Sequence, residues 1–123
     1  MSGGIVWLLV LAGGAGAVTR FGVDGVLTAR TPGYFPWATL VINLTGSLLL
    51  GVLTGLTLHH GSPADVKAVL GTGFCGGYTT FSTASVEAVR LARRGDLVAA
   101  LTQLVASAGG TLAAAALGIQ LAS

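Results

Sequence analysis

Four long apolar segments follow one another along the chain, separated by short clusters of charged and turn-forming residues. The stretches that contain no Asp, Glu, Lys or Arg are residues 1–19, 31–64, 68–86 and 97–123. Each is long enough for one helix of about 20 residues across a bilayer and too short for two helices with a loop. The pattern therefore predicts an all-α membrane protein, with residues 1–123 forming a single domain of four transmembrane helices near 4–22, 38–58, 66–90 and 97–121.

The composition agrees with a location in the membrane. Only 8% of the residues are charged and 53% are hydrophobic, and the mean hydropathy is +0.85. No segment remains for a soluble domain, so we expect the function to be carried out within the bilayer, in a multi-pass protein of the inner or plasma membrane. The net charge of +2 is small and the basic residues lie at the span ends, which gives no support to nucleic-acid binding.

The third segment is long enough to cross a bilayer, but its centre disfavours a helix. Gly76 and Gly77 have the largest helix penalty among ordinary residues, and Tyr78, Thr79 and Thr80, which follow, are aromatic or β-branched. Lipid cannot satisfy the backbone groups freed by a break, so the break must face protein or an aqueous cavity. Broken helices at this depth present carbonyl and N–H groups that bind ions. We therefore predict a helix break at Gly76-Gly77 with an ion site beside it.

The second span has polar and small residues on one helix face. They recur every four residues: Thr39, Asn43, Ser47, Gly51 and Gly55. Such a stripe is consistent with close helix packing alone. Asn43 also points to function, because a buried amide requires partners and offers two N–H donors.

Small residues also recur every four positions in the first span, and the predicted span 4–22 contains no acidic residue. Gly13 and Ala17 form one such pair, which favours close helix packing. Arg20 follows near the end of the span. It either marks an anion vestibule or extends its side chain to the membrane interface.

Two further polar features lie toward the C-terminus. Glu87 precedes a cluster of arginines, so it either pairs with one of them or lines an aqueous entrance. In the fourth span, Ser107 and Thr111 lie four residues apart, where their hydroxyls suit either packing or a narrow path.

The basic residues are distributed unevenly between the two sides. Five flank the first and third connections and only Lys67 lies on the opposite side; the five are Arg20, Arg30, Arg90, Arg93 and Arg94. The positive-inside rule then predicts that both termini face outward.

Three segments together resemble the bacterial fluoride channel family, Fluc or CrcB. Residues 13–21, GGAGAVTRF, are similar to its glycine motif in the first helix, and residues 39–47, TLVINLTGS, to its Thr-Asn-Gly-Ser pattern in the second. Residues 73–83, GFCGGYTTFST, are close to the third-helix signature and are the most specific match. In the fourth helix the match is loose. The resemblance extends over nearly the whole chain.

The resemblance implies a channel, not an enzyme, that passively exports fluoride from the cytoplasm and so relieves its toxicity. It implies a four-helix subunit, broken in its third helix, that pairs with a second subunit in antiparallel orientation to form two narrow pores. It also implies a structural Na⁺ at the dimer centre, which is not transported. In this sequence the carbonyl groups of Gly76 and Thr79 would bind the ion, one pair from each subunit.

The same resemblance assigns a fluoride pathway. Asn43 would donate a hydrogen bond to the passing ion, and Phe81 would turn its positive ring edge toward it. The candidate hydroxyl donors are Thr39, Ser82, Thr83 and Ser107. Because fluoride is small and tightly hydrated, the pore must replace its water with closely spaced donors.

Two positions depart from the family pattern. Ala84 stands where the family normally has a second phenylalanine, and Gln103 where a tyrosine is usual. Some members work as heterodimers in which each chain has lost part of the apparatus and keeps one orientation. Ala84 and the uneven charge distribution fit that alternative, so the second subunit is either a copy of this chain or a paralogue.

Two other classes remain as alternatives. A small drug/proton antiporter also has four short helices, but it needs a carboxylate embedded in the membrane, usually in the first helix, and the predicted first span has none. A non-conducting assembly subunit would use its polar stripes for packing only.

Overall fold

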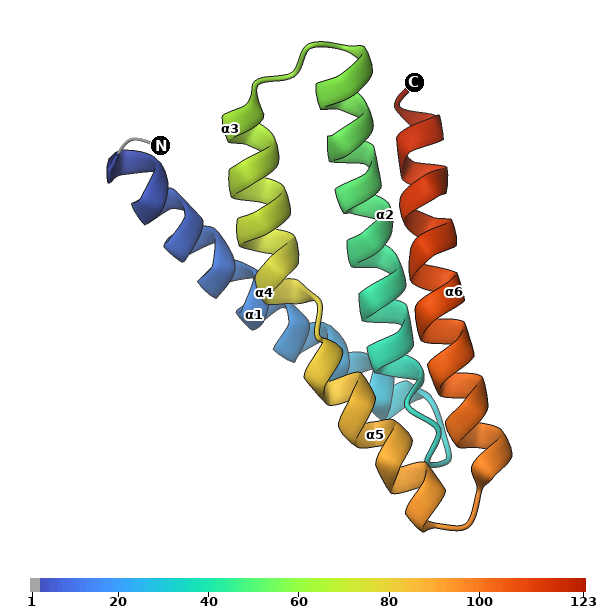
Figure 1. Cartoon of the computed structure of the whole chain (residues 1–123). Coiled ribbons are helices and arrows are strands. Elements are labelled where there is room, and N and C mark those ends of the chain that lie inside the picture. The colour runs from blue at the N-terminus through green and yellow to red at the C-terminus, as the bar shows by residue number, and fades with distance from the viewer. Residues whose placement is uncertain (1–2) are drawn as a thin grey trace.

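The computed structural model describes residues 3–123 and contains only helices and their connections (Figure 1). Three helices are long and apolar enough to cross a membrane: α1 (Gly3–Arg30), α2 (Trp37–His59) and α6 (Leu97–Leu121). Between α2 and α6 the chain forms α3 (Ala64–Val66), the π-helical segment η1 (Lys67–Cys75), α4 (Gly76–Tyr78) and α5 (Phe81–Arg93). The all-helical architecture and the interrupted third span were both predicted from the sequence.

The interruption, however, lies a few residues beyond its predicted position. The helix continues through Gly76-Gly77, and the extended residues are Thr79 (φ −82°, ψ 159°) and Thr80 (φ −149°, ψ 119°). The prediction of a break at Gly76-Gly77 is therefore wrong in position. The physical reason is that β-branched threonine fits extended backbone well, while Gly77 is required for close packing.

That packing joins the third span to α1. A β-carbon on Gly77 would lie 2.1 Å from the carbonyl oxygen of Gly13, and one on Gly16 would lie 2.1 Å from that of Phe74. The small residues predicted to allow helices to approach are therefore in contact with another backbone. They bring the third span against the middle of α1.

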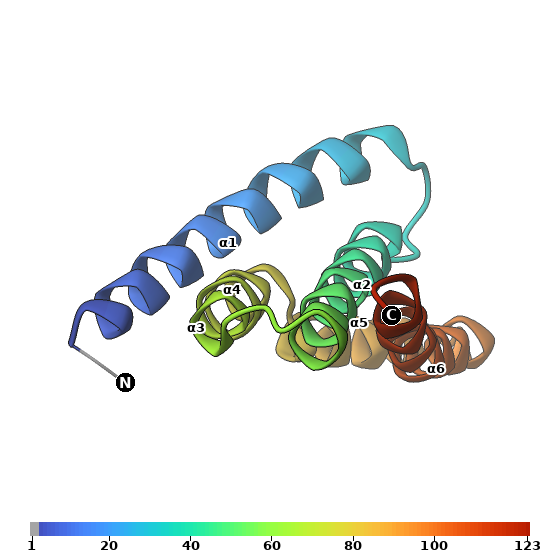
Figure 2. The same ribbon diagram turned by 90° about the horizontal axis from the view of Figure 1, so that it is seen from above.

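Helix α1 is longer than the predicted span 4–22 and crosses the others obliquely (Figures 1 and 2). Its 28 residues would measure about 42 Å, more than the thickness of the hydrocarbon core, so it either tilts or extends into the headgroup region. Because it runs to Arg30, it includes Asp24, and the expectation that the first helix has no acidic residue is wrong. Asp24 Oδ1 accepts a hydrogen bond from Thr28 Oγ1 at 3.2 Å.

Helices α2 and α6 lie side by side and run in the same direction (Figure 1). Glycines line the contact: a β-carbon on Gly51 would lie 2.2 Å from the Ala115 carbonyl oxygen, and one on Gly118 would lie 2.4 Å from that of Leu48. The C-terminal half of the polar and small stripe on α2 therefore serves packing. This leaves Thr39, Asn43 and Ser47 as its polar members without such a packing role.

A cluster of three residues joins the α1–α2 loop to the α5–α6 loop. Tyr34 Oη donates to Asp96 Oδ2 at 2.5 Å, and the Arg94 guanidinium lies 4.0 Å from the centre of the Tyr34 ring. Asp96 Oδ1 also accepts from the N–H of Ala99 at 3.0 Å, which caps α6. The cluster fixes the start of α6 relative to α2.

The contact between α1 and the third span predicts the effect of Gly16→Ala. The new methyl group would overlap the Phe74 carbonyl, and overpacking of this kind typically costs about 1–3 kcal/mol. Gly14→Ala is the matched control, because a methyl group there would meet no other segment within 4 Å, and alanine favours a helix by up to about 1 kcal/mol over glycine. Thermal unfolding in detergent should show Gly16→Ala well below the wild type and Gly14→Ala at or above it. Equal midpoints for the two variants would contradict this packing.

The loop cluster predicts a pH dependence. The hydrogen bonds from Tyr34 and Ala99 hold the pKa of Asp96 below its ordinary value, so this contribution to stability is present above about pH 4 and lost as the pH falls through the folded pKa. The hydrogen bond to Asp96 raises the pKa of Tyr34. The contribution of Tyr34 to stability is therefore complete below about pH 10 and is lost as the pH rises through the pKa of Tyr34 in the folded protein.

The measurement compares thermal midpoints of the wild type and Tyr34→Phe across the pH range. The wild type should be the more stable at neutral pH, and the difference should shrink at both extremes. A difference that does not change with pH would contradict the cluster.

Candidate functional site

The break between α4 and α5 is held by one side chain from α2. Asn43 Nδ2 donates to the Thr80 carbonyl at 2.9 Å, and Asn43 Oδ1 accepts from the Thr80 N–H at 2.8 Å. Asn43 is only 7% exposed. Both backbone groups of Thr80 are therefore satisfied by a buried amide where a helix would have used its own backbone.

Thr80 in turn caps the helix that follows. Its Oγ1 accepts from the N–H of Thr83 at 3.1 Å. The first N–H groups of a helix have no partner within it, and among residues 3–123 those of Phe81 and Ser82 make no hydrogen bond to the protein. α5 therefore opens with two free N–H donors beside the break.

Carbonyl groups are freed on the other side of the break. The last helical bond is from the Thr79 N–H to the Cys75 carbonyl, at 2.8 Å. The next donors in a continuous α-helix would be Thr80 to Gly76 and Thr83 to Thr79, but both N–H groups are bonded to side chains instead. Gly76 and Thr79, whose carbonyls lose these helical donors, line an open groove.

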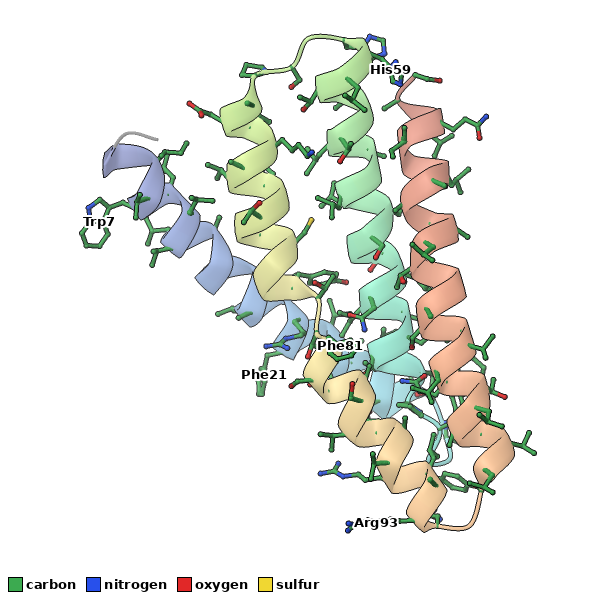
Figure 3. All side chains as sticks on the ribbon, viewed as in Figure 1. Trp7, Phe21, His59, Phe81 and Arg93 are labelled. Carbon is green, nitrogen blue, oxygen red and sulfur yellow. The ribbon has the colours of Figure 1, made fainter. Side chains whose placement is uncertain are left out.

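The groove has a volume of about 740 Å³ and lies between α2, the two halves of the third span and α6. It brings together five of the residues predicted from the sequence: Asn43, Gly76, Thr79, Phe81 and Ser107. Phe81 begins α5 directly after the break (Figure 3). Its side chain is 87% exposed, so this chain alone does not cover the ring. Thr72, Ser85 and Thr111 add hydroxyls to the same groove.

A smaller pocket of about 300 Å³ lies against α1 and holds other predicted residues. Arg20, Thr39 and Thr83 line it, together with Asp24. Thr80 lines both this pocket and the groove. The predicted residues are thus divided between two cavities that meet at the break, and Ser82 lines neither.

Glu87 lies near the smaller pocket. Its carboxylate interacts with the Thr39 hydroxyl and with the charges of Asp24 and Arg90, while Oε1 is buried without a hydrogen-bond partner among residues 3–123. Arg94, one of the partners considered for Glu87, instead lies over the Tyr34 ring.

Comparison with known proteins gives a clear result. Residues 7–119 match the family model described as CrcB-like protein, Camphor Resistance (CrcB). The chain is 53% identical, over 95% of its length and 85% of the relative, to fluoride-specific ion channel FluC 1 of Leifsonia xyli subsp. xyli. It is 50% identical, over 97% of each chain, to fluoride-specific ion channel FluC 2 of Cutibacterium acnes. The chain belongs to the CrcB/FluC family. It is therefore a multi-pass membrane protein, as the apolar spans predicted.

In this CrcB/FluC chain, the burial of Gln103 was not predicted; the sequence showed this residue only as a departure from the family's usual tyrosine. Gln103 is 0% exposed, and both its amide oxygen and its amide nitrogen lack hydrogen-bond partners among residues 3–123. One turn along α6, the Ser107 Oγ is also buried and unpartnered. Helical spacing placed Ser107 on a polar stripe, but no sequence signal indicated that Gln103 would be fully buried.

The burial of Gln103 predicts the effect of Gln103→Met. An unsatisfied buried polar group costs about 1–3 kcal/mol, and an apolar side chain of similar shape removes that cost. The thermal midpoint of the variant in detergent should therefore rise. Gln120→Met, at an exposed position on the same helix, is the control and should leave the midpoint close to that of the wild type. A lower midpoint for Gln103→Met would show that the amide has partners outside this chain.

Proposed function

We propose that this chain forms a fluoride-selective channel that passively exports fluoride from the cytoplasm and so limits its toxicity. The observation that supports this most strongly is the identity of about half of all residues, over nearly the full length, with proteins named fluoride-specific ion channels. The broken helix and its cavities provide groups of the right chemistry for an anion. No chemical step is involved, because transport requires only that the ion be bound weakly and released.

The donors for fluoride lie at the break. Asn43 Nδ2 uses one hydrogen to bond Thr80, so its second N–H is available to an ion in the groove. The free N–H groups at the start of α5 add donors, and the positive end of the helix dipole favours an anion there. Phe81 presents a ring whose edge is positive. We assign Asn43 and Phe81 to the centre of the fluoride path.

Hydroxyl groups extend the path on both sides. Ser107 lines the groove, and its buried Oγ has no hydrogen-bond partner among residues 3–123, while Thr39 and Thr83 line the smaller pocket. Ser82 belongs to the first turn of α5 and contributes its backbone N–H. A fluoride ion that exchanges its water for these groups one at a time avoids a large dehydration barrier.

Arg20 gives the smaller pocket the character of a vestibule. Its side chain is partly buried beside Thr39 and Thr83, and a fixed positive charge raises the local concentration of anions. Asp24 and Glu87 lie nearby and limit this field. We place Glu87 at the edge of the vestibule, where its charge opposes strong retention of the ion.

A structural sodium ion fits the other side of the break. Sodium is a hard cation that prefers oxygen ligands. The Gly76 and Thr79 carbonyls are released from helix bonding, and both residues line the groove. One chain provides only two such residues, so a second subunit must complete the site. When bound, the ion would supply a positive charge that stabilises the carbonyl ends of the broken helices.

The groove also marks the surface for that second subunit. The exposed Phe81 ring and the open cavity leave the pathway incomplete in a single chain. We propose that a second subunit packs on this face in antiparallel orientation, which brings two pairs of carbonyls to one centre and forms two pores. The antiparallel arrangement follows from the family resemblance.

The second subunit is either a copy of this chain or a paralogue. Ala84 lines the groove beside Phe81, so one aromatic ring of the expected pair is absent from this wall. The five-to-one distribution of basic residues favours one fixed orientation. Both observations support the heterodimer as the second candidate.

Fluoride efflux from liposomes tests the proposal. The chain reconstituted alone should release fluoride rapidly, retain chloride and lose most of its activity when Na⁺ is replaced by N-methylglucamine. Phe81→Ile should reduce the flux at least 10-fold with little change in thermal midpoint, because Phe81 is exposed in the subunit. Thr57→Val, on α2 near His59, is the control and should leave the flux unchanged.

The outcomes separate the candidates. Rapid flux from the chain alone supports a homodimer, and flux only after co-expression with a paralogue supports the heterodimer. Phe81→Ile with wild-type flux would contradict the assigned path. An absence of fluoride flux in both preparations would contradict the channel.

A further inference from the structure

We infer that Asn43 is a positioning residue for the sodium site, because its amide takes the Thr80 N–H and thereby keeps the Gly76 carbonyl free to bind the cation. This inference deepens the proposed function and rests on its sodium site. It gives Asn43 a second role, separate from donating a hydrogen bond to fluoride.

The Asn43 amide bonds both backbone groups of Thr80, as a neighbouring strand would. The two bonds, at 2.9 Å and 2.8 Å, hold Thr80 in an extended conformation (φ −149°, ψ 119°). Removing either bond leaves a backbone group without a partner inside the membrane, where the cost is high. The geometry therefore makes the extended conformation dependent on this one side chain.

The alternative conformation would use the Gly76 carbonyl. The helix is intact up to the bond from the Thr79 N–H to the Cys75 carbonyl. One further residue in helical conformation would direct the Thr80 N–H to the Gly76 carbonyl, which is the next acceptor in the series. A cation and this N–H therefore compete for the same oxygen, and Asn43 removes the competitor.

Asn43 acts through Thr80 on the other carbonyl as well. The Thr80 side chain accepts the Thr83 N–H, which would otherwise be the i+4 donor to the Thr79 carbonyl. This capping bond requires the non-helical conformation at Thr80 that Asn43 maintains. Both proposed sodium ligands thus depend on the bond by which Asn43 accepts the Thr80 N–H.

Neighbouring residues of α2 hold Asn43 at hydrogen-bonding distance from Thr80. A β-carbon on Gly46 would lie 2.3 Å from Thr79 Cγ2, so α2 packs directly on the break. Thr45 Oγ1 and Tyr78 Oη lie 3.0 Å apart and share a hydrogen bond. Since α2 is held against residues 78–80 at several points, the Asn43 amide is positioned by the fold and not by the ion.

Two substitutions separate the positioning role from the donor role. In Asn43→Asp, the carboxylate can still accept the Thr80 N–H but cannot donate to fluoride, and its charge repels the anion. In Asn43→Leu, a side chain of similar size makes neither bond, and the Thr80 N–H becomes free to bond the Gly76 carbonyl. We therefore expect Asn43→Asp to keep the sodium response and lose fluoride flux. We expect Asn43→Leu to lose the flux and to need more Na⁺ for the same response.

The readout is sodium binding to the purified full-length protein, independent of flux. Thermal midpoints are measured while NaCl replaces N-methylglucamine chloride at constant ionic strength, and amide hydrogen exchange is followed at Thr80. The wild type and Thr57→Val should be stabilised by Na⁺ with the same midpoint concentration. Asn43→Leu should require at least 10-fold more Na⁺, and Asn43→Asp no more than the wild type.

Each outcome bears on a different claim. A wild-type protein without any response to Na⁺ would reject the sodium site, and this inference with it. A wild-type response that Asn43→Leu retains would reject the inference and leave the sodium site intact. If Asn43→Leu does not fold, Asn43→Ala replaces it, because its methyl group cannot accept the Thr80 N–H; an unchanged Na⁺ midpoint in that variant would equally reject the inference.

Discussion

A peptide group within the hydrocarbon core has no water to bond, and the structure of this protein depends on how that constraint is met at Thr79 and Thr80. The break leaves carbonyls on one side and N–H groups on the other. Asn43 satisfies Thr80 and the Thr80 hydroxyl satisfies Thr83. The groups without a helical partner include the carbonyls of Gly76 and Thr79, two residues that line the groove, and two N–H groups at the start of α5. An ion pathway can use such groups.

Close backbone contacts make this arrangement possible. Gly13, Gly16 and Gly77 allow α1 and the third span to cross at contact distance, and Gly46 allows α2 to press on Thr79. The third span is therefore held on two sides, while its groove side stays open. α1 instead turns Trp7 away from the bundle, and this side chain is 71% exposed (Figure 3), as expected for a surface that contacts lipid. Phe21, also on α1, is 83% exposed but lines the smaller pocket.

The two cavities meet at the break, so the break lies between the two parts of the proposed ion path. The smaller one carries Arg20 and lies against α1, and the larger one carries Phe81 and Ser107 and is the proposed surface for a second subunit. Thr80 belongs to both, so an ion that passes from one to the other must cross the segment that Asn43 holds. The proposed cation site and the proposed fluoride path therefore share one structural element, although the ions would bind its opposite ends.

Sequence alone predicted the apolar spans, the existence of an interruption near residues 76–80 and the polar candidates Asn43 and Ser107, because hydropathy and helix propensity are local properties. The candidate Phe81 came from the family resemblance. The sequence-based prediction placed the break at Gly76-Gly77, since propensity cannot tell a glycine that ends a helix from one that packs against Gly13. Tertiary structure decided that Asn43 bonds Thr80, that α1 extends to include Asp24 and that Gln103 is fully buried. These features depend on which distant segments meet, and only the packed chain brings those segments together.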